Sequence, residues 1–380
     1  MMSKEKRRVP KLRFPGFTED WEQRKLSEVV TINPKTELPD KFKYVDLESV
    51  VGTNLLGFQV IKKENAPSRA QRLASYGDVF YQTVRPYQRN NYLFENIDKD
   101  MVFSTGYAQL RSKLDSYFLL TLVQNDNFVK VVLDNCTGTS YPAINGSELG
   151  RITVQIPSND AEANQIGKVF RGIDNIITLH QHKLEKLKLA KKALLQKLFP
   201  NNGSQFPEIR FKGFTDAWEQ RELSSLTEYI GTGKSRFAIK EFGEYAILGS
   251  TNVIGYDDAY DYDGNFILTA RVGANAGQLY QYSGKVKITD NTVFLMSDRS
   301  QFIYYALTHF DLRRLSFGTG QPLVKSSELQ KLKLCVPVSK SEQEKIGEIF
   351  NNIDNIITLH QCKLDKLQDV KKGLLQKMFV

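Results

Sequence analysis

Apolar residues in two long segments recur about every 3.5 positions, in steps that alternate between four and three. His180 and Lys191 fill two gaps in the first apolar series, and His360 and Lys371 fill the same gaps in the second. This period is typical of a coiled-coil seam, so both segments are predicted to be long helices. The seam positions are Ile166, Phe170, Ile173, Ile177, Leu184, Leu187, Leu194 and Leu198, and then Ile346, Phe350, Ile353, Ile357, Leu364, Leu367, Leu374 and Met378.

Each predicted helix has a start signal. Asn159 with Glu162, and Ser339 with Glu342, fit an N-cap followed by an acidic third residue. A helix of about 40 residues is about 60 Å long and cannot bury its apolar stripe alone. We expect the two helices to form an antiparallel coiled coil with pseudo-twofold symmetry. The alternative, that each helix packs on its own domain, fits less well because such a domain is only about 30 Å across.

The chain contains an internal repeat. Residues 166–200 and 346–380 share "IDNIITLHQ" and are identical at 23 of 35 aligned positions. The middles, residues 31–137 and 228–317, differ. Similar ends with different middles indicate one scaffold role performed twice with two specificities. Duplication of a structural domain is the alternative, but it explains less well why only the middles diverged.

The divergent middles are predicted to be mixed α/β domains. Helices are expected at 116–133 and 300–316, and Gly, Asn and Asp separate short β-rich runs. The expected strands lie in residues 76–84, 101–110, 245–256, 265–273 and 286–295. The predicted organisation is a basic tail (1–13), a first domain (14–157), a central helix (158–200), a second domain (206–337) and a C-terminal helix (338–380).

Composition is that of a globular protein, with 41% hydrophobic residues. No apolar run approaches the roughly 18–20 residues of a membrane span. No apolar stretch follows the opening "MMSKEKRRVPKLRF", and the three cysteines lack CxxC spacing. We therefore expect a cytoplasmic protein without a signal peptide.

The net charge of +9 is unevenly distributed. Residues 1–13 carry six basic residues and one acidic residue, and residues 160–199 carry eight and four. The two divergent domains are close to neutral. Any binding to nucleic acid must therefore come from local clusters rather than from overall basicity.

Polar, basic and aromatic residues concentrate in three loop regions, 68–92, 231–237 and 269–278. Arg, Asn and Gln can bind base edges through two hydrogen bonds, and Gly lets the backbone approach a phosphate. Ordinary solvated loops are the alternative. The candidate DNA-binding residues are Arg69, Arg72, Arg85, Tyr87, Gln88, Arg89, Asn90, Lys234, Arg236, Arg271, Asn275 and Gln278.

No catalytic or metal site is predicted. "GTGKS" resembles part of a phosphate-binding loop, but Glu228 stands where the first glycine of that motif belongs. His180 and His182 are two positions apart and point in different directions on a helix, and no HExxH occurs. Catalysis by this chain alone is therefore not expected.

The chain resembles the specificity subunit of type I restriction–modification enzymes over essentially its whole length. The resemblance rests on "GFTEDWEQRKLSEV" and "GFTDAWEQRELSSL" before the two domains, and on "GDVFYQTVRP", "FSTGYAQLR" and "TDNTVFL" within them. It also rests on "GTGQPLVKSSELQKLKLCVPVSKSEQEKIGEIF", which leads into the last helix.

This resemblance implies that each variable domain reads one half of a bipartite DNA target. It also implies that the paired helices set the gap between the half-sites and dock two modification subunits, which hold S-adenosylmethionine and methylate adenine. Two restriction subunits would add ATP- and Mg-dependent translocation and cleavage, and this chain would hold no cofactor itself. A non-catalytic protein–protein adaptor is the competing class, and a self-contained nucleotide-dependent enzyme is a third.

Overall fold

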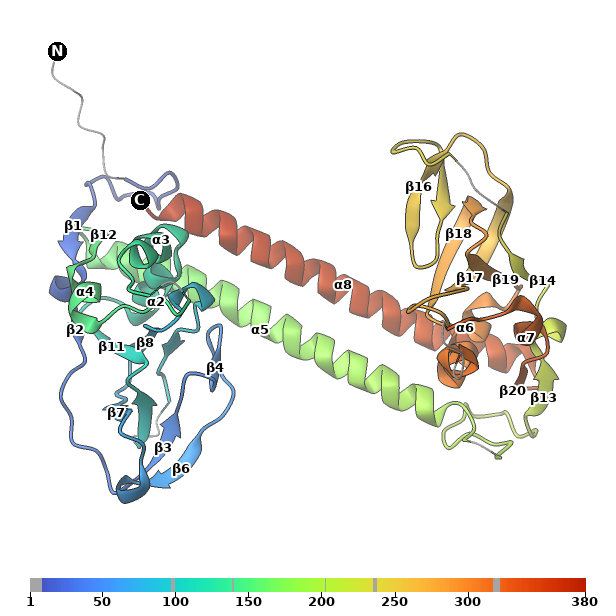
Figure 1. The fold of residues 1–380 in the computed structure, drawn as a ribbon, viewed down its shortest axis with the longest axis horizontal. Helices are drawn as coiled ribbons and strands as arrows, with labels where there is room; N and C mark the ends of the chain where they lie inside the picture. Colours follow the sequence, from blue (N-terminus) through green and yellow to red (C-terminus); the bar gives the residue numbers. More distant parts are fainter. Residues whose placement is uncertain (1–8, 97–99, 139, 202, 235–237, 317–321) are drawn as a thin grey trace, which may run out of the picture. The chain divides into compact units, whose positions relative to one another are not determined.

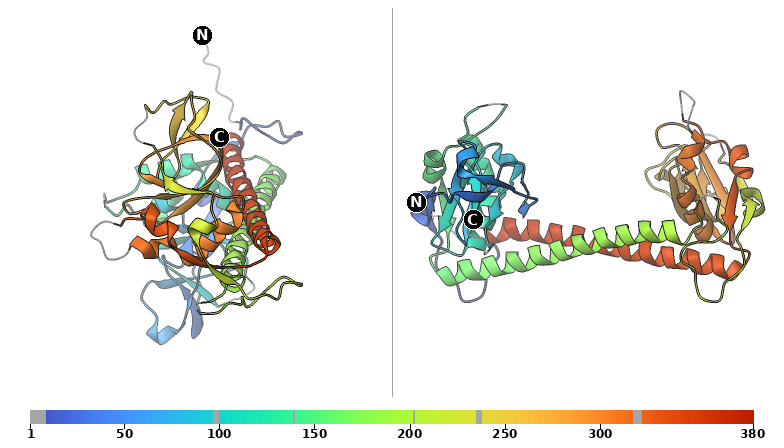
Figure 2. Two further views of the ribbon diagram at one scale, coloured as in Figure 1. Left: turned by 90° about the vertical axis from the view of Figure 1, so that its right-hand side faces the viewer. Right: turned by 90° about the horizontal axis from the view of Figure 1, so that it is seen from below.

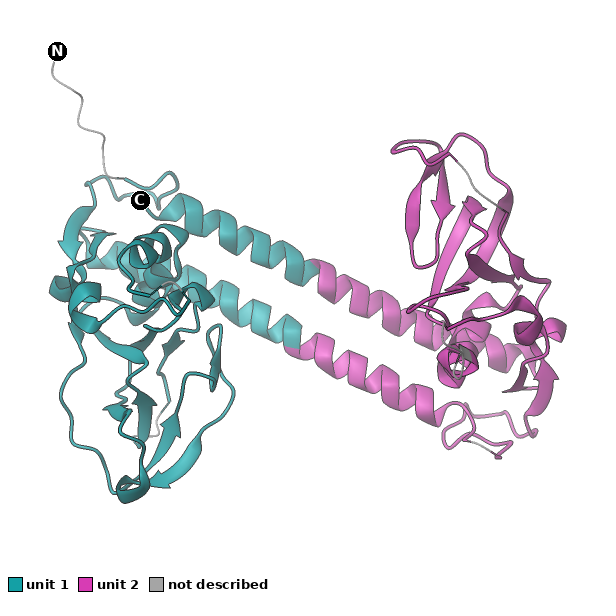
Figure 3. Cartoon of the chain, viewed as in Figure 1, with its two compact units in different colours: residues 1–181, 363–380 teal, residues 182–362 magenta. Residues whose placement is uncertain are grey.

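The computed structural model describes residues 9–96, 100–138, 140–201, 203–234, 238–316 and 322–380. The chain forms two compact units: residues 1–181 with 363–380 (unit 1), and residues 182–362 (unit 2; Figure 3). Two long helices, α5 (Asp160–Lys197) and α8 (Lys340–Met378), each contribute to both units (Figure 1). Both predicted long helices are therefore present.

Within each unit, α5 and α8 lie side by side and run in opposite directions (Figure 2). In unit 1, Phe170 of α5 faces Phe379, just after α8, with ring centroids 6.0 Å apart. One turn further along α5, Asp174 pairs with Lys371, earlier in α8, at 2.6 Å. In unit 2, Lys191 of α5 pairs with Asp354 of α8 at 2.6 Å. The predicted antiparallel coiled coil is confirmed.

The seam positions differ in what they contact. Ile166 and Phe170 belong to the hydrophobic core of unit 1. Ile346 and Phe350 belong to the core of unit 2. The seam positions nearer the helix centres are half-buried, except for Leu184 and Leu364, which are buried. Each helix therefore packs on its partner helix and, at its ends, on a domain.

Asn159 and Ser339 directly precede α5 and α8, as predicted for N-caps, and Glu162 and Glu342 are the third residues of these helices. Asn159 caps α5, accepting a hydrogen bond from the Ala161 amide at 2.8 Å. Glu162 is buried and accepts two hydrogen bonds from Arg13, at 2.7 and 2.8 Å. Glu342 binds Arg210 in the same way. A buried carboxylate requires a strong partner, and the arginine before each domain supplies it.

Unit 1 holds two four-stranded sheets (Figure 1). One has the order β2-β11-β8-β9 and is antiparallel, and the other has the order β6-β3-β10-β7 with β3 and β10 parallel. The strands are β2 (Val30–Ile32), β3 (Lys41–Val45), β6 (Gln59–Lys62), β7 (Ala70–Leu73), β8 (Asp78–Gln82), β9 (Tyr92–Leu93), β10 (Met101–Ser104) and β11 (Tyr107–Ser112). Two short pairs, β1 (Glu22–Lys25) with β12 (Thr153–Ile156) and β4 (Val50–Val51) with β5 (Asn54–Leu55), and two short helices, α1 (Leu26–Val29) and α4 (Gly146–Arg151), complete the unit.

The helix predicted at 116–133 is two helices, α2 (Ser116–Gln124) and α3 (Asp126–Asp134). Asn125 breaks it with an extended backbone, and its side chain accepts a hydrogen bond from the Asn127 amide. The side-chain Nδ2 of Asn125 also donates to the Leu375 carbonyl on α8 at 3.1 Å. The break therefore serves a contact between distant parts of the sequence. The strand predicted at 101–110 is also divided, into β10 and β11.

Unit 2 is built on one six-stranded sheet of order β14-β19-β17-β18-β15-β16, in which only β15 and β18 are parallel. The predicted strand run 245–256 is a hairpin of two strands, and α6 ends where Asp311 adopts a left-handed backbone (φ 61°). The elements are β13 (Glu219–Glu222), β14 (Tyr229–Thr232), β15 (Tyr245–Leu248), β16 (Val253–Asp257), β17 (Tyr262–Ala270), β18 (Leu279–Ile288), β19 (Thr292–Met296), α6 (Ser300–Phe310), α7 (Ser326–Gln330) and β20 (Lys333–Val336), which pairs with β13.

Each domain core is completed by the end of a long helix that arrives from elsewhere in the sequence. In unit 1, Phe379 packs against Trp21 and Phe118. In unit 2, Phe199 packs against Trp218 and Phe302. The predicted fold class, two mixed α/β domains on paired helices with an internal repeat, is confirmed. Within the described ranges, no helix combines the length and apolar character needed to cross a membrane.

Candidate nucleic-acid interface

The loop that follows β8 holds five of the candidate residues in a constrained backbone. Arg85 and Arg89 both adopt the left-handed conformation, each with φ of 55°. They flank a short 3-10 helix, Pro86–Gln88. Non-glycine residues in this region carry backbone strain, which concentrates at functional sites and persists only where surrounding contacts impose it.

Side-chain amides impose this conformation. Gln82, at the end of β8, donates to the Gln88 side chain at 2.8 Å and accepts from the Asn90 amide at 3.2 Å. The Asn91 side chain accepts from the Gln82 backbone amide at 2.8 Å. Gln88 and Asn90 therefore help to build the loop, and Asn90 also accepts from the Gly52 amide.

The two arginines of this loop are used differently. Arg89 donates to the Gln124 carbonyl at the end of α2 and pairs with Asp126 at 2.6 Å, so its guanidinium is already engaged within unit 1. Arg85 stacks over the Tyr141 ring, 4.2 Å from its centroid. Tyr141 is 64% exposed and Tyr87 is 50% exposed. A guanidinium stacked on an exposed aromatic ring is suited to nucleic acid, because both planar groups can stack on bases.

Arg69 and Arg72 lie on the other sheet of unit 1. Arg69 is exposed just before β7, and its carbonyl accepts from the Thr105 amide. Arg72 is half-buried on β7, and burial lowers the pKa of its guanidinium. Its Nε is buried without a hydrogen-bond partner among the described residues, so only the terminal amino groups could reach a ligand. β7 belongs to the sheet of order β6-β3-β10-β7, whereas β8, which leads into the Arg85 loop, belongs to the other sheet, so the two groups of candidates lie on different sheets.

In unit 2, Lys234 and Arg271 flank the turn between β18 and β19. Lys234 bridges to Thr289, and the Arg271 amide donates to the Asn291 carbonyl at 2.9 Å. Both side chains are exposed, although Lys234 lies 3.6 Å from Asp261. A phosphate could compete with Asp261 for this lysine, because the lysine is exposed and the 3.6 Å separation is longer than a strong charge-assisted hydrogen bond.

Asn275 and Gln278 belong to a neighbouring turn. Both are exposed, and the Gln278 amide donates to the Asn275 carbonyl at 3.0 Å. Gly273 and Gly277 give the turn its positive φ angles, and a Cβ at Gly277 would meet the Arg313 backbone at 2.6 Å. The turn therefore packs tightly while its amide side chains face solvent. Arg236 lies outside the described residues, as do residues 1–8 of the basic tail.

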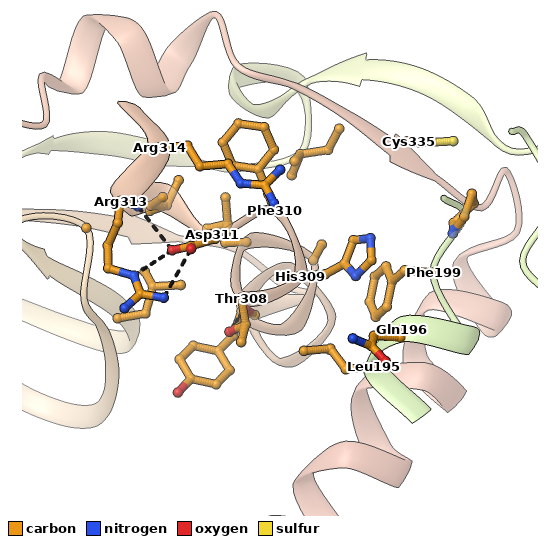
Figure 4. Close-up of a pocket in the computed structure, with 18 of the residues that line it drawn as sticks. Leu195, Gln196, Phe199, Thr308, His309, Phe310, Asp311, Arg313, Arg314 and Cys335 are labelled. Atoms are coloured by element: carbon orange, nitrogen blue, oxygen red, sulfur yellow. Dashed lines mark hydrogen bonds and ion pairs between the residues drawn. The ribbon is translucent and has the colours of Figure 1, made fainter. Parts of the chain in front are cut away.

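A groove of about 1110 Å³ lies in unit 2 between the end of α5 and the end of α6 (Figure 4). His309 stacks on Phe199 there, with ring centroids 5.1 Å apart. Burial lowers the pKa of the His309 imidazole, which also makes hydrogen bonds to the backbone of Pro200 and Leu195. Arg313 forms a two-bond pair with Asp311. The His309 contacts hold the end of α5 against the end of α6.

Two features of the structure were not predicted from the sequence. One is Tyr141, which follows Arg85 by more than 50 residues and lies beside it only in the fold. The other is a set of exposed apolar residues on the long helices, outside the seam, which could have been found because two of them repeat within "IDNIITLHQ". This set consists of Ile176, Leu179, Leu189, Ile356, Leu359 and Val370, with exposures from 43% to 69%.

Among the residues that the structure describes, no group of three or more His, Cys, Asp or Glu side chains is placed to hold a metal ion. The candidate residues thus form one ordered cluster after β8 in unit 1 and two adjacent turns in unit 2. The cluster in unit 1 carries arginine, tyrosine and amide side chains, and the turns in unit 2 carry lysine, arginine and amide side chains, while Arg69 and Arg72 lie apart at β7.

Comparison with known proteins gives consistent results. The type I restriction enzyme MjaVIII specificity subunit of Methanocaldococcus jannaschii is 24% identical over 325 residues, 73% of each chain. The putative MjaX specificity subunit of the same organism is 21% identical over 398 residues, covering 94% of this chain and 92% of the relative.

Solved structures share the fold. The crystal structure of a type I restriction–modification S subunit from M. genitalium has a TM-score of 0.71 and 16% identity, covering 98% of this chain and 99% of that one. A chain from a structural study of complex assembly and conformational transition in the type I R-M system has a TM-score of 0.51 and 20% identity, with 97% and 99% covered.

The family model of the type I restriction modification DNA specificity domain matches the chain twice, at residues 18–189 and at residues 215–369. Each match contains one divergent domain and most of the long helix that follows it. The chain therefore belongs to the type I restriction–modification DNA specificity family and carries two copies of its domain.

Proposed function

We propose that this chain gives a type I restriction–modification complex its DNA sequence specificity, with each unit reading one half of a bipartite target. The observation that carries the proposal is the double match to the DNA specificity domain on an internal repeat whose ends agree and whose middles differ. Two different readers on one repeated scaffold are what a target with two different halves requires.

Base and phosphate contacts are assigned to candidate residues that are exposed or, in the case of Arg85, half-buried, and to two exposed tyrosine rings. In unit 1 these are Arg85 with the rings of Tyr87 and Tyr141, and in unit 2 they are Lys234 and Arg271. Arg89 holds the loop in place through Gln124 and Asp126. A bidentate contact from arginine to a base contributes about 1–3 kcal/mol of discrimination, whereas a phosphate contact contributes equally on every sequence.

The chain acts as a non-catalytic cytoplasmic component, and its partners supply the chemistry. Two modification subunits would hold S-adenosylmethionine, and two restriction subunits would use ATP and Mg. The exposed residues Ile176 and Leu179, and their counterparts Ile356 and Leu359, support docking of two equivalent partners. Apolar side chains exposed at equivalent positions of a repeat are suited to two copies of one binding surface.

A binding experiment tests this function against the adaptor alternative. The full chain, with and without its modification subunits, is mixed with duplexes that carry the methylated sequence mapped in cells and with scrambled duplexes. The proposal predicts preference for the mapped sequence by a factor of 10³ or more, as is typical of specific DNA-binding proteins. If the chain binds all duplexes equally and binds protein partners tightly, the adaptor function would be favoured.

Arg85→Ala and Arg271→Ala variants refine the assignment over a salt series. Loss of a base contact weakens binding to the target by about 1–3 kcal/mol and relaxes specificity at one position. Loss of a phosphate contact lowers the slope of affinity against salt by about one unit instead. Arg89→Ala is a useful comparison, because Arg89 binds Gln124 and Asp126 and its loss should also lower the thermal stability of unit 1. Unchanged affinity and slope in both test variants would contradict the assignment.

A further inference from the structure

One carboxylate in each copy of "IDNIITLHQ" joins three elements. In unit 1, Asp174 of α5 accepts a hydrogen bond from the Tyr117 hydroxyl of α2 at 2.7 Å and pairs with Lys371 of α8 at 2.6 Å. Each carboxylate oxygen therefore has its own partner. The divergent domain of unit 1, called its recognition domain from here on, therefore meets both α5 and α8 at this side chain.

Unit 2 repeats the arrangement with the helices exchanged. Asp354 of α8 accepts from the Tyr305 hydroxyl of α6 at 2.7 Å and pairs with Lys191 of α5 at 2.6 Å. The aspartates occupy equivalent positions of the repeat, and so do the lysines that fill the gaps in the seam. The two tyrosines come from the divergent middles and still reach the same carboxylate.

These contacts are partly shielded from water. The Asp174 and Lys371 side chains are 19% and 27% exposed, and those of Asp354 and Lys191 are 32% and 24% exposed. Burial raises the pKa of Tyr117 and of Tyr305, and the neighbouring carboxylates raise both further. The phenols therefore remain protonated and keep donating. Hydrogen bonds to an ionised carboxylate are short, strong and directional, so they fix geometry as well as contribute energy.

A second contact two turns earlier in each long helix limits the freedom of the domain further. A Cβ at Gly167 would overlap Oδ1 of Asp115, the N-cap residue of α2. A Cβ at Gly347 would lie 2.9 Å from the amide nitrogen of Phe302 in α6. Seven residues separate each glycine from its aspartate, so both contacts lie on one face of the helix. Two contacts on one face fix the angle of a packed helix better than one.

We infer that Asp174 and Asp354 are positioning residues that hold each recognition domain at one angle on the helix pair, and that they determine how sharply the protein distinguishes targets by gap length. This inference rests on the proposed function. The protein can reject a target whose gap is one base pair too long only if neither recognition domain can rotate on the helices to reach its half-site. Loosening the joint between domain and helices would therefore relax the choice of gap before it weakens the reading of either half-site.

The test uses the full chain in complex with its modification subunits. The combined Asp174→Asn and Asp354→Asn variant keeps the size of both side chains and removes their charge. Binding is measured on duplexes that carry the mapped target with its natural gap, and with gaps one base pair shorter and longer. We expect the preference for the natural gap to fall about tenfold, which corresponds to about 1.4 kcal/mol, while affinity for the natural target changes much less. Asp369→Asn, an exposed change on α8, is the matched control and leaves the preference intact.

A second variant, Tyr117→Phe with Tyr305→Phe, removes only the hydroxyls and remains informative if the aspartate variant does not fold. It should relax the choice of gap in the same direction. An unchanged preference in the folded variants, with lower thermal stability, would show that the carboxylates are structural only and would overturn the inference. A wild-type complex that binds every duplex alike would overturn the proposed function and this inference together.

Discussion

The ring of Phe379, next to the last residue of the chain, stacks on the ring of Phe118 in α2 with centroids 5.6 Å apart. Phe199 takes the same place in unit 2, where it stacks on Phe302 at 5.9 Å. A residue just after α8 thus completes the core of the first domain, more than 250 positions from Phe118 in the sequence. The long helices are structural parts of both domains as well as the link between them.

Removal of the Phe379 ring should therefore destabilise unit 1. Phe379→Ala deletes a buried aromatic ring, which typically costs about 3–5 kcal/mol. Trp21 lies 6.0 Å from this ring, so its fluorescence in a Trp218→Phe background reports unfolding of unit 1 in urea. Val380→Ala, at an exposed neighbour, serves as the control. Equal urea midpoints for both variants would mean that the helix end does not stabilise the domain.

Two glycines of α5 should respond oppositely to the same substitution. A Cβ at Gly167 would overlap Asp115, whereas a Cβ at Gly172 would meet nothing within 4 Å. Gly172→Ala should stabilise the protein by about 0.5–1 kcal/mol, because alanine favours the helix. Gly167→Ala should destabilise it by about 1–3 kcal/mol through steric overlap. Thermal unfolding of the two variants decides this, and stabilisation by both would refute the close contact.

Unit 2 should lose stability in mild acid. Burial, with a smaller contribution from the nearby Arg314 charge, lowers the pKa of His309 below its ordinary value of about 6.5. The unfolded chain therefore binds a proton more readily than the folded chain. The contribution of the neutral imidazole to the free energy of unfolding is fully present above about pH 6.5. It declines as the pH falls towards the folded-state pKa. Urea unfolding of wild type and His309→Gln from pH 5 to 8 tests this, and identical pH profiles would contradict it.

The repeated exposed apolar residues should contribute to binding of the modification subunits. Replacing Ile176, Leu179, Ile356 and Leu359 by serine should weaken co-purification with these partners, because apolar residues at an interface centre can each contribute about 2 kcal/mol. Leu189 is more exposed but has no apolar counterpart in the repeat, since Asp369 occupies that position. Leu189→Ser should therefore leave binding unchanged. Normal binding by the fourfold variant would exclude this surface.

The sequence predicted the parts of the fold that depend on local periodicity. The 3.5-residue pattern identified both long helices, and the internal repeat indicated that they pair. The sequence did not predict that Glu162 binds Arg13. It also did not predict that Asn125 divides a helix and contacts Leu375. In both cases the partners lie far apart in the chain. Periodicity describes which face of an element is apolar and carries no information about a specific distant polar partner.

The candidate interface was predictable only as a set of residue types. Arginine and amide side chains in loops indicated where to look, but the sequence could not separate Arg85, stacked on an exposed tyrosine, from Arg89, engaged with Asp126. The left-handed backbone at both residues was also unforeseen, because it is imposed by the side chain of Gln82 and its neighbours. Residue type gives the chemistry that is available, and tertiary contacts decide which groups remain available.

If two independent domains each read one half-site from a shared scaffold, exchanging one of them should exchange one half-site. Residues 31–137 are replaced by the corresponding segment of a relative with a different target, and methylated adenines are mapped across the genome of cells that carry the hybrid chain. One half-site is expected to change to that of the donor, while the other half-site and the gap stay as they were. A change in both half-sites, or methylation without a bipartite target, would contradict it.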